Sequence, residues 1–162
     1  MRAAGLRGVF FLLTFLCLLL GGFALGKKFA DSKLDTANQS AASGEGIAWV
    51  PFSVSERDAI LASGKPLFID FTADWCITCK FNERTAINTA AVRALIKERG
   101  IVAMKADWTN SNPEITEALA EYGRVGVPFY LFYPGDGVEK PEIFPELLTE
   151  SIVLDKLGSA RN

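Results

Sequence analysis

The chain has 162 residues, a length that accommodates one folded domain plus a targeting segment. Its formal net charge of −2 gives no support to nucleic-acid binding through phosphate neutralisation. The sequence has no histidine, which excludes Ser-His and Cys-His catalysis and any His-ligated metal site.

The first residues have the pattern of an export segment. Basic residues precede an uncharged, strongly apolar run at residues 8–26. Ala24 and Gly26 are small residues of the kind a signal peptidase prefers, yet the run is also long enough to span a bilayer. We therefore predict that residues 1–26 form a signal peptide or a membrane anchor. The rest of the chain would then lie outside the cytoplasmic membrane, in the periplasm.

Residues 27–46 are polar and small, which predicts a flexible linker, and residues 47–162 are predicted to form one domain. Apolar periodicity and turn residues predict these elements in chain order: a strand at 47–52, a helix at 55–62, a strand at 66–71, helices at 76–86 and 89–99, a strand at 101–106, a helix at 114–122, a strand at 126–133, an antiparallel edge strand at 138–144 and a final helix at 149–157. This order predicts an α/β fold with a mixed central sheet flanked by helices. The predicted core comprises Leu67, Ile69, Val102, Met104, Leu131 and Phe132.

Two cysteines, Cys76 and Cys79, stand where a predicted strand gives way to a helix. The third, Cys17, lies in the apolar N-terminal run and is interpreted as a small hydrophobic residue. A Cys-x-x-Cys pair at such a junction is typical of a thiol–disulfide redox site. So short a loop would stabilise the fold little as a structural disulfide, and two thiolates do not complete a zinc site. We predict a redox-active disulfide between Cys76 and Cys79, with no other cofactor and no metal.

The two cysteines are predicted to have different roles. Cys76 is expected at the exposed N-terminus of a helix, where backbone N–H groups and the helix dipole stabilise a thiolate. Cys76 is therefore the predicted nucleophile. Cys79 is one turn further along and more buried, and it would resolve the mixed disulfide.

Residues 73–80, Ala-Asp-Trp-Cys-Ile-Thr-Cys-Lys, resemble the active-site segment of thioredoxin-fold proteins, and residues 125–128, Val-Gly-Val-Pro, resemble their cis-proline loop. More narrowly, residues 105–110 and 145–149 resemble the C-terminal periplasmic domain of DsbD-type transmembrane thiol–disulfide interchange reductases. The resemblance implies a thioredoxin fold. It also implies a domain that takes electrons from a membrane-embedded donor and passes them to periplasmic proteins, in disulfide isomerisation or cytochrome c maturation. Because this sequence has one hydrophobic segment instead of a polytopic core, the donor is expected to be a separate protein.

The resemblance also assigns roles to two charged residues. Asp70 lies in an otherwise apolar strand and would be the buried acid that accepts the proton of Cys79, with a pKa raised by burial. Lys105, on the neighbouring strand, is a possible charge partner that tunes this pKa. The alternatives are that Asp70 ends its strand facing solvent and that Lys105 points outward.

Three further residues are predicted to contact the substrate. Pro128 is expected to be cis, which would place the backbone of Val127 beside the cysteines, where it could pair with an extended substrate strand. The alternative is an ordinary trans proline. Trp75 is expected to cover the site and offer an apolar contact surface, with plain core packing as the alternative. The aromatic residues of 129–133 are predicted to belong to the core of the sheet.

These patterns predict a periplasmic protein-disulfide reductase, which residues 8–26 would anchor to the membrane if they are not cleaved. Its partners would be periplasmic protein thiols and disulfides. A disulfide oxidase or isomerase is the alternative within the same chemistry. The residues also leave open a non-catalytic binding module and a two-thiolate carrier of Cu(I).

Overall fold

The computed structural model describes residues 46–138 and 140–161 of the chain. The predictions for the targeting segment at 1–26, including Cys17, and for nearly all of the linker lie outside these residues. No helix in the part described is long and apolar enough to cross a membrane. The elements are β1 (Trp49–Pro51), α2 (Val54–Ala62), β2 (Leu67–Thr72), α3 (Ile77–Asn82), the π-helical turn η2 (Glu83–Ile87), α4 (Ala90–Glu98), β3 (Val102–Asp107), α5 (Pro113–Ala120), β4 (Phe129–Tyr133), β5 (Glu142–Ile143) and α6 (Glu150–Leu157).

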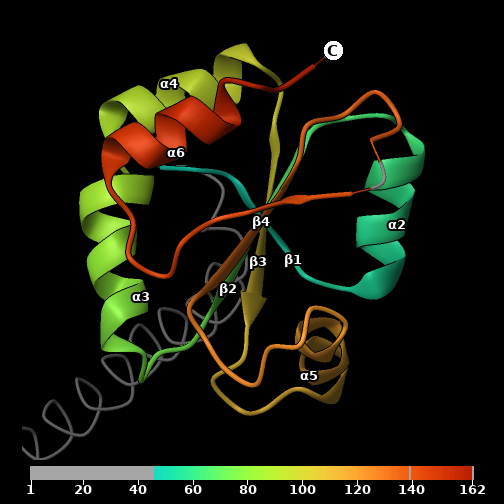
Figure 1. Ribbon diagram of the computed structural model, residues 1–162, viewed down its shortest axis with the longest axis vertical. Helices are drawn as coiled ribbons and strands as arrows, with labels where there is room; N and C mark the ends of the chain where they lie inside the picture. Colours follow the sequence, from blue (N-terminus) through green and yellow to red (C-terminus); the bar gives the residue numbers. More distant parts are fainter. Residues whose placement is uncertain (1–45, 139, 162) are drawn as a thin grey trace, which may run out of the picture. The chain divides into compact units, whose positions relative to one another are not determined.

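The strands form one mixed sheet in the order β1-β3-β2-β4-β5. β3 pairs in parallel with both β1 and β2, while β4 pairs antiparallel with β2 and with β5. Helices cover both faces, with α3, α4 and α6 on one side and α2 and α5 on the other (Figure 1). This is the predicted fold class, confirmed in element order and in the mixture of parallel and antiparallel pairs.

Strand β2 is buried along its whole length, so its two sets of alternating side chains serve two cores. Leu67, Ile69 and Phe71 pack with α2 and α5. Phe68 points to the opposite face and packs with η2, α4 and α6. Asp70 and Thr72 follow the alternation of Phe68, so the only carboxylate of the strand faces the side of the sheet that carries α3.

The predicted helices form at the expected places because each has a polar residue at its start. Ser53, Thr89 and Thr149 each accept a backbone N–H bond at the first turn of α2, α4 and α6. Asn112 does the same for α5, followed by Pro113 in its first turn. The observed boundaries lie within two residues of the predicted ones for these four helices.

Three predictions about the elements are wrong in detail. The predicted helix at 76–86 changes from α to π geometry at Glu83, where the Asn88 N–H donates to the Glu83 carbonyl oxygen at 2.8 Å. The predicted strand at 126–133 begins only at Phe129, after a proline that has no N–H for the ladder. The predicted edge strand at 138–144 contracts to the two residues of β5, which are flanked on both sides by prolines close by in the sequence.

Of the predicted core, Val102 is half-buried, whereas the other members are buried. The register explains the difference. The pairing of β1 with β3 begins at Trp49 and Ala103, so Val102 lies just beyond the part of β3 that β1 covers. The aromatic residues of β4 are all buried, as predicted for sheet core.

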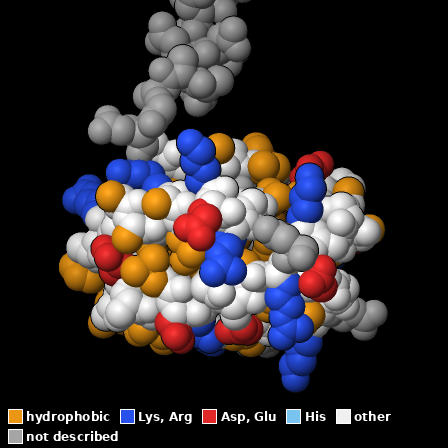
Figure 2. All heavy atoms as spheres, turned by 90° about the horizontal axis from the view of Figure 1, so that it is seen from above, with side chains coloured by type: hydrophobic (Ala, Val, Ile, Leu, Met, Phe, Trp, Pro, Cys, Tyr) orange, Lys and Arg blue, Asp and Glu red, His pale blue; other side chains and the backbone are white. Residues whose placement is uncertain are grey.

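The end of the domain at α4 and α6 has an ordinary mixed surface. Figure 2 shows basic, acidic and apolar side chains interspersed on this face, with no large area of one charge. Such a surface favours solubility and indicates no particular partner there.

The turn after β4 packs closely against two distant segments. The Arg161 N–H donates to the Pro134 carbonyl oxygen at 2.7 Å, and the Asp136 N–H donates to the Gly64 carbonyl oxygen at 3.0 Å. Gly135, with φ of +94°, lies between them, and a Cβ there would stand 2.6 Å from the Arg161 oxygen and 2.9 Å from the Gly64 oxygen. Gly137 in the same turn also has positive φ, at +69°, but a Cβ there would meet open space. Position 135 therefore favours glycine for two reasons, the positive φ and the close approach of the Arg161 and Gly64 carbonyl oxygens.

We expect Gly135→Ala to lower the free energy of unfolding by about 3 kcal/mol, because backbone atoms must move to make room for the methyl group. Gly137→Ala is the matched control and should cost about 1 kcal/mol, the price of a left-handed conformation alone. Urea unfolding of the two variants and the wild type measures the difference. Equal losses in both variants would contradict the close approach at Gly135.

Candidate functional site

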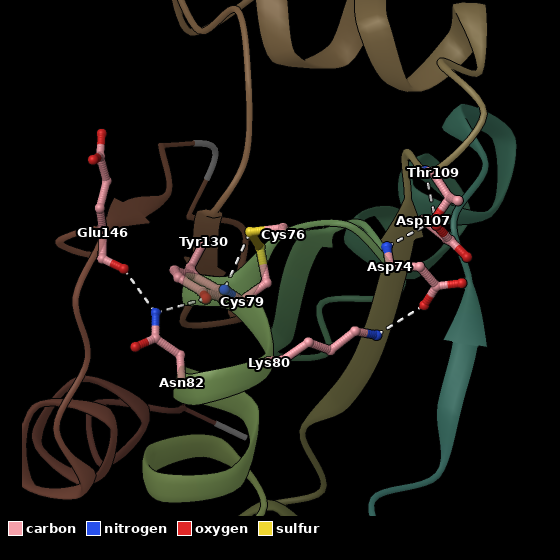
Figure 3. Close-up of a disulfide and its surroundings, with 9 residues drawn as sticks. All are labelled: Asp74, Cys76, Cys79, Lys80, Asn82, Asp107, Thr109, Tyr130 and Glu146. Atoms are coloured by element: carbon pink, nitrogen blue, oxygen red, sulfur yellow. Dashed lines mark hydrogen bonds and ion pairs between the residues drawn. A yellow bond between two sulfur atoms is a disulfide. The ribbon is translucent and has the colours of Figure 1, made fainter.

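The two cysteines of the motif lie at the start of α3, directly after β2 and a short connecting loop. Cys76 is the N-cap of the helix, and its sulfur accepts the backbone N–H of Cys79 at 3.1 Å (Figure 3). The two sulfurs form a disulfide with an S–S distance of 1.98 Å. Once reduced, a thiolate at Cys76 would keep this backbone donor and would lie at the positive end of the helix dipole.

Both cysteines are more enclosed than the sequence predicted. Cys76 is 6% exposed and Cys79 is 2% exposed, so the expectation of an exposed Cys76 is wrong. Ala73 packs against the pair from one side and Val127 from another, which leaves little of Cys76 accessible. The expected ranking is confirmed, because Cys79 is the more buried of the two. Of the two sulfur-bearing residues, the predicted nucleophile Cys76 is thus the more accessible to solvent.

The carboxyl group of Asp70 is buried in β2, which excludes the alternative that it faces solvent. Its Oδ1 has no hydrogen-bond partner among the described residues. Burial raises the pKa of Asp70 to about 7, because desolvation penalises the charged form. The positive charge of Lys105 opposes this rise in pKa, and the negative charge of Glu83 adds to it. A buried carboxyl with a pKa in this range can exchange protons near neutral pH.

Lys105 lies opposite Asp70 in the register of β2 and β3, which confirms that the two are neighbours. Its ammonium group, however, forms an ion pair with Glu83, at 2.8 Å between Nζ and Oε1. It also lies over the ring of Trp49, 4.6 Å from the centroid. Lys105 therefore acts on the pKa of Asp70 through its charge, as a charge partner would, while its ion pair is with Glu83. Glu83 was not predicted, although its position four residues after Cys79 would place it on the same face of a regular helix.

Trp75 is 57% exposed, which excludes plain core packing. Its indole N–H donates to the Thr109 carbonyl oxygen at 3.2 Å, and its ring packs at an angle to that of Trp108. The Thr109 hydroxyl also accepts the Asp74 N–H at 2.9 Å and donates to a carboxylate oxygen of Asp107. Figure 3 shows Asp74, Asp107 and Thr109 together. The loop after β3 thus holds the loop before Cys76 and orients Trp75 with one face open to solvent. The sequence did not predict this contact, since it joins residues 34 and 35 positions apart.

The peptide bond between Val127 and Pro128 is cis, as predicted. Val127 packs against the two cysteines, so the backbone of this loop lies beside the disulfide. A groove of about 280 Å³ runs along the loop, lined by residues 123–128 and Glu146. Arg124 and Glu146 form an ion pair at 3.0 Å between the two walls. The groove is where the predicted extended substrate strand would lie.

Asn82 is a buried polar residue of α3 that the sequence analysis missed. Its amide nitrogen donates to the Tyr130 hydroxyl at 2.9 Å and to the Glu146 carbonyl oxygen at 2.7 Å (Figure 3). Its oxygen accepts the Leu148 N–H at 3.1 Å. Burial, with the charge of Asp70, raises the pKa of Tyr130, which keeps its hydroxyl protonated. Asn82 thereby joins α3, one turn after Cys79, to β4 and to the loop before α6. The sequence does contain an indication of this role, because a residue three positions after Cys79 lies on the same, core-facing side of a helix and is polar.

The site therefore combines a cysteine pair joined by a disulfide, a buried acid with a raised pKa and a groove along the loop that packs against the cysteines. Cys76, Cys79 and Val127 come together, with Pro128 joined to Val127 by the cis bond, and Asp70 lies in the strand that leads to the cysteines. A dithiol in this setting can exchange with a disulfide of another molecule without further cofactors.

Thiol:disulfide interchange proteins named DsbD match the chain in sequence. The protein from Ralstonia nicotianae is 36% identical over 93 residues, which are 55% of this chain and 15% of that protein. DsbD 1 of Pseudomonas aeruginosa is 36% identical over 89 residues, or 52% of this chain and 15% of that protein. The chain thus spans a small part of these relatives.

Solved structures with the same fold include the C-terminal domain of Neisseria meningitidis DsbD in its reduced form, with a TM-score of 0.55 and 22% identity. That match covers 69% of this chain and 100% of the domain. A thioredoxin from Thermus thermophilus has a TM-score of 0.56 and 19% identity, covering 69% of this chain and 86% of its own. The family model described as thioredoxin-like matches residues 48–135, a segment that holds both cysteines, the buried acid and the cis-proline. The chain therefore belongs to the thioredoxin-like family.

Proposed function

We propose that the chain is a thiol–disulfide oxidoreductase of the cell envelope that reduces disulfides of periplasmic proteins. The observation that carries the proposal is the Cys76–Cys79 disulfide at the start of α3, with Val127 packed against it. The sequence relatives, which are named thiol:disulfide interchange proteins, support the same chemistry.

The reaction would proceed in two exchange steps. The thiolate of Cys76 attacks one sulfur of the substrate disulfide, whose S–S bond breaks, and the other substrate sulfur leaves as a thiolate. Cys79 transfers its proton to the carboxylate of Asp70 and attacks the Cys76 sulfur. The mixed disulfide then breaks and the second substrate thiolate leaves. The substrate has gained two electrons, and the domain has the disulfide present in the structure.

Asp70 is suited to the second step because its pKa of about 7 allows it to take up a proton near neutral pH and release it afterwards. Val127 and the groove beside it would hold an extended segment of the substrate through backbone hydrogen bonds. Trp75, held by Thr109, would supply an apolar wall. A membrane-embedded donor would return electrons to the domain, as the similarity to DsbD proteins suggests.

Reduction is favoured over oxidation by the two residues between the cysteines. Ile77 and Thr78 carry no charge that would strongly stabilise the thiolate of the reduced form. Weak stabilisation of the reduced form gives a reducing couple. The export pattern at the N-terminus supports a periplasmic location. Disulfide isomerisation and cytochrome c maturation are the pathways that the DsbD resemblance suggests.

We expect Cys76→Ser to abolish disulfide reduction in an insulin turbidity assay, because the attacking sulfur is lost. Cys79→Ala is the matched variant and should accumulate a mixed disulfide between Cys76 and its substrate. Mass spectrometry of these adducts from a periplasmic extract identifies the natural partners. Equal activity in wild type and Cys76→Ser would leave only the role of a binding module.

The reduction potential separates a reductase from an oxidase. We expect a midpoint on the order of −270 to −200 mV after equilibration with glutathione, in the range of reducing thioredoxin-fold proteins. A midpoint on the order of −120 mV, as for strong oxidants, would instead assign the domain as an oxidase.

The buried Asp70 predicts a specific pH dependence of stability. Its pKa is raised on folding, so its contribution to stability is fully present below the unfolded pKa and is lost as pH rises through about 7. We expect Asp70→Asn to gain stability relative to wild type between pH 5 and pH 8 by at most about 3 kcal/mol, because the wild type loses roughly 1.4 kcal/mol for each pH unit between pH 5 and its pKa of about 7. Urea unfolding of the oxidised proteins at both pH values measures this difference.

The exposed Asp155 of α6 provides the control, because Asp155→Asn should give the same difference from wild type at both pH values. Asp70→Asn should also slow the resolving step and remove its dependence on a group with a pKa of about 7. A pH-independent effect of Asp70→Asn on stability would contradict a raised pKa at this carboxyl group.

A further inference from the structure

The outward side of α3 carries exposed apolar residues beside Cys76. Its inward side buries Cys79 and Asn82, whereas Ile77 is 86% exposed and Phe81 is 52% exposed. A groove of about 510 Å³ follows this outward side, lined by Asp74, Ile77, Lys80, Phe81, Arg84 and Thr85. We call it the α3 groove. Large apolar side chains exposed together around a groove are typical of a surface that binds another molecule.

The charges along the α3 groove are unequally compensated. Lys80 forms an ion pair with Asp74 at 2.9 Å, so the end nearest Cys76 is close to neutral. Arg84, at the other end, has no carboxylate within ion-pair distance among the described residues, although the chain as a whole has a net negative charge. The neighbouring carboxylate, Glu83, points inward to Lys105 instead. The groove therefore presents an apolar floor and one uncompensated cation.

The positions of these groups relative to the reactive sulfur set the geometry of an occupant. Phe81 and Arg84 follow Cys76 by five and eight residues in the sequence. At a helical rise of 1.5 Å per residue, Arg84 lies roughly 12 Å along the axis from Cys76. A molecule in exchange with Cys76 can therefore reach Arg84 with a segment of about two helical turns.

We propose that the α3 groove docks an acidic, amphipathic segment of the protein that exchanges disulfides with Cys76. An apolar side chain of this segment packs on Ile77 and Phe81, and a carboxylate pairs with Arg84. The inference rests on the function proposed above and adds the chemistry of the partner. A second copy of the chain fits less well, because pairing two α3 grooves would cover both Cys76 residues and block exchange.

Two synthetic helical peptides test the proposal. Each carries one cysteine bonded to 2-nitro-5-thiobenzoate, with leucines four positions away on both sides. Eight positions from the cysteine on both sides, the first peptide has glutamates and the second has lysines. Cys76 of the reduced protein bonds the peptide sulfur and nitrothiobenzoate leaves as a coloured thiolate, after which Cys79 displaces the peptide thiol.

Wild-type protein should react with the glutamate peptide about threefold faster than with the lysine peptide, the size expected of one exposed ion pair. Arg84→Glu should reverse the preference, and high salt should remove it. Phe81→Ser should slow both peptides about fivefold through the loss of apolar contact. Because the preference is a ratio measured on one protein, a general change in the reactivity of Cys76 cancels.

Lys97→Glu, on the exposed side of α4, and Ile143→Ser, on the edge strand β5, are the matched controls. Both should keep the wild-type rates and ratio, and thermal unfolding should show that all four variants are folded. Equal rates for the two peptides in wild type, or an unchanged ratio in Arg84→Glu, would overturn the proposal. A wild-type dimer that Phe81→Ser dissociates would do the same and assign the groove to a second copy. Absence of nitrothiobenzoate release from both peptides and from the free bis-thionitrobenzoate disulfide would overturn the proposed function itself.

Discussion

The burial of strand β2 on both faces is the constraint on which the rest of the site depends. β2 pairs with β3 on one side and β4 on the other, and helices cover it above and below. A carboxyl group at Asp70 therefore cannot reach water, and desolvation rather than any single neighbour determines its pKa. The same strand ends in the loop that presents Cys76. One rigid element thus positions both the acid and the disulfide.

The ion pair of Lys105 with Glu83 modifies the rise in pKa that burial gives this acid. A lysine paired directly with Asp70 would stabilise the carboxylate and return its pKa toward the ordinary value. Here the ammonium group is shared with a second carboxylate, whose negative charge raises the pKa of Asp70 again. The three charges form one coupled group beneath α3. Their arrangement leaves a buried carboxyl group whose Oδ1 has no hydrogen-bond partner within the described structure and whose pKa is about 7.

Helix α3 departs from the usual distribution, with a polar residue beside Cys79 on its inward side and large apolar residues on its outward side. Its inward side carries Asn82, whose side-chain amide is hydrogen-bonded to β4 and to the loop before α6. Glu83 follows at the start of η2. Its outward side carries Ile77 and Phe81. An amphipathic helix in an isolated domain places its apolar side inward. The departure is explained if the inward side fastens the redox helix to the domain and the outward side meets the partner.

The sequence by itself determined the order of elements and the cysteine pair at the strand–helix junction, whereas the buried acid and the cis proline were expected from the family resemblance. The first two features depend on local periodicity, spacing and residue type, which act over a few positions. The tertiary structure alone decided that Cys76 is nearly enclosed, that Lys105 pairs with Glu83, and that Thr109 holds Trp75. It also decided the change to π geometry after Asn82. Most of these features are contacts between residues that are far apart in the chain, and the π turn goes against the local preference for a regular α-helix. Which partner a side chain contacts is decided only when whole elements pack against one another.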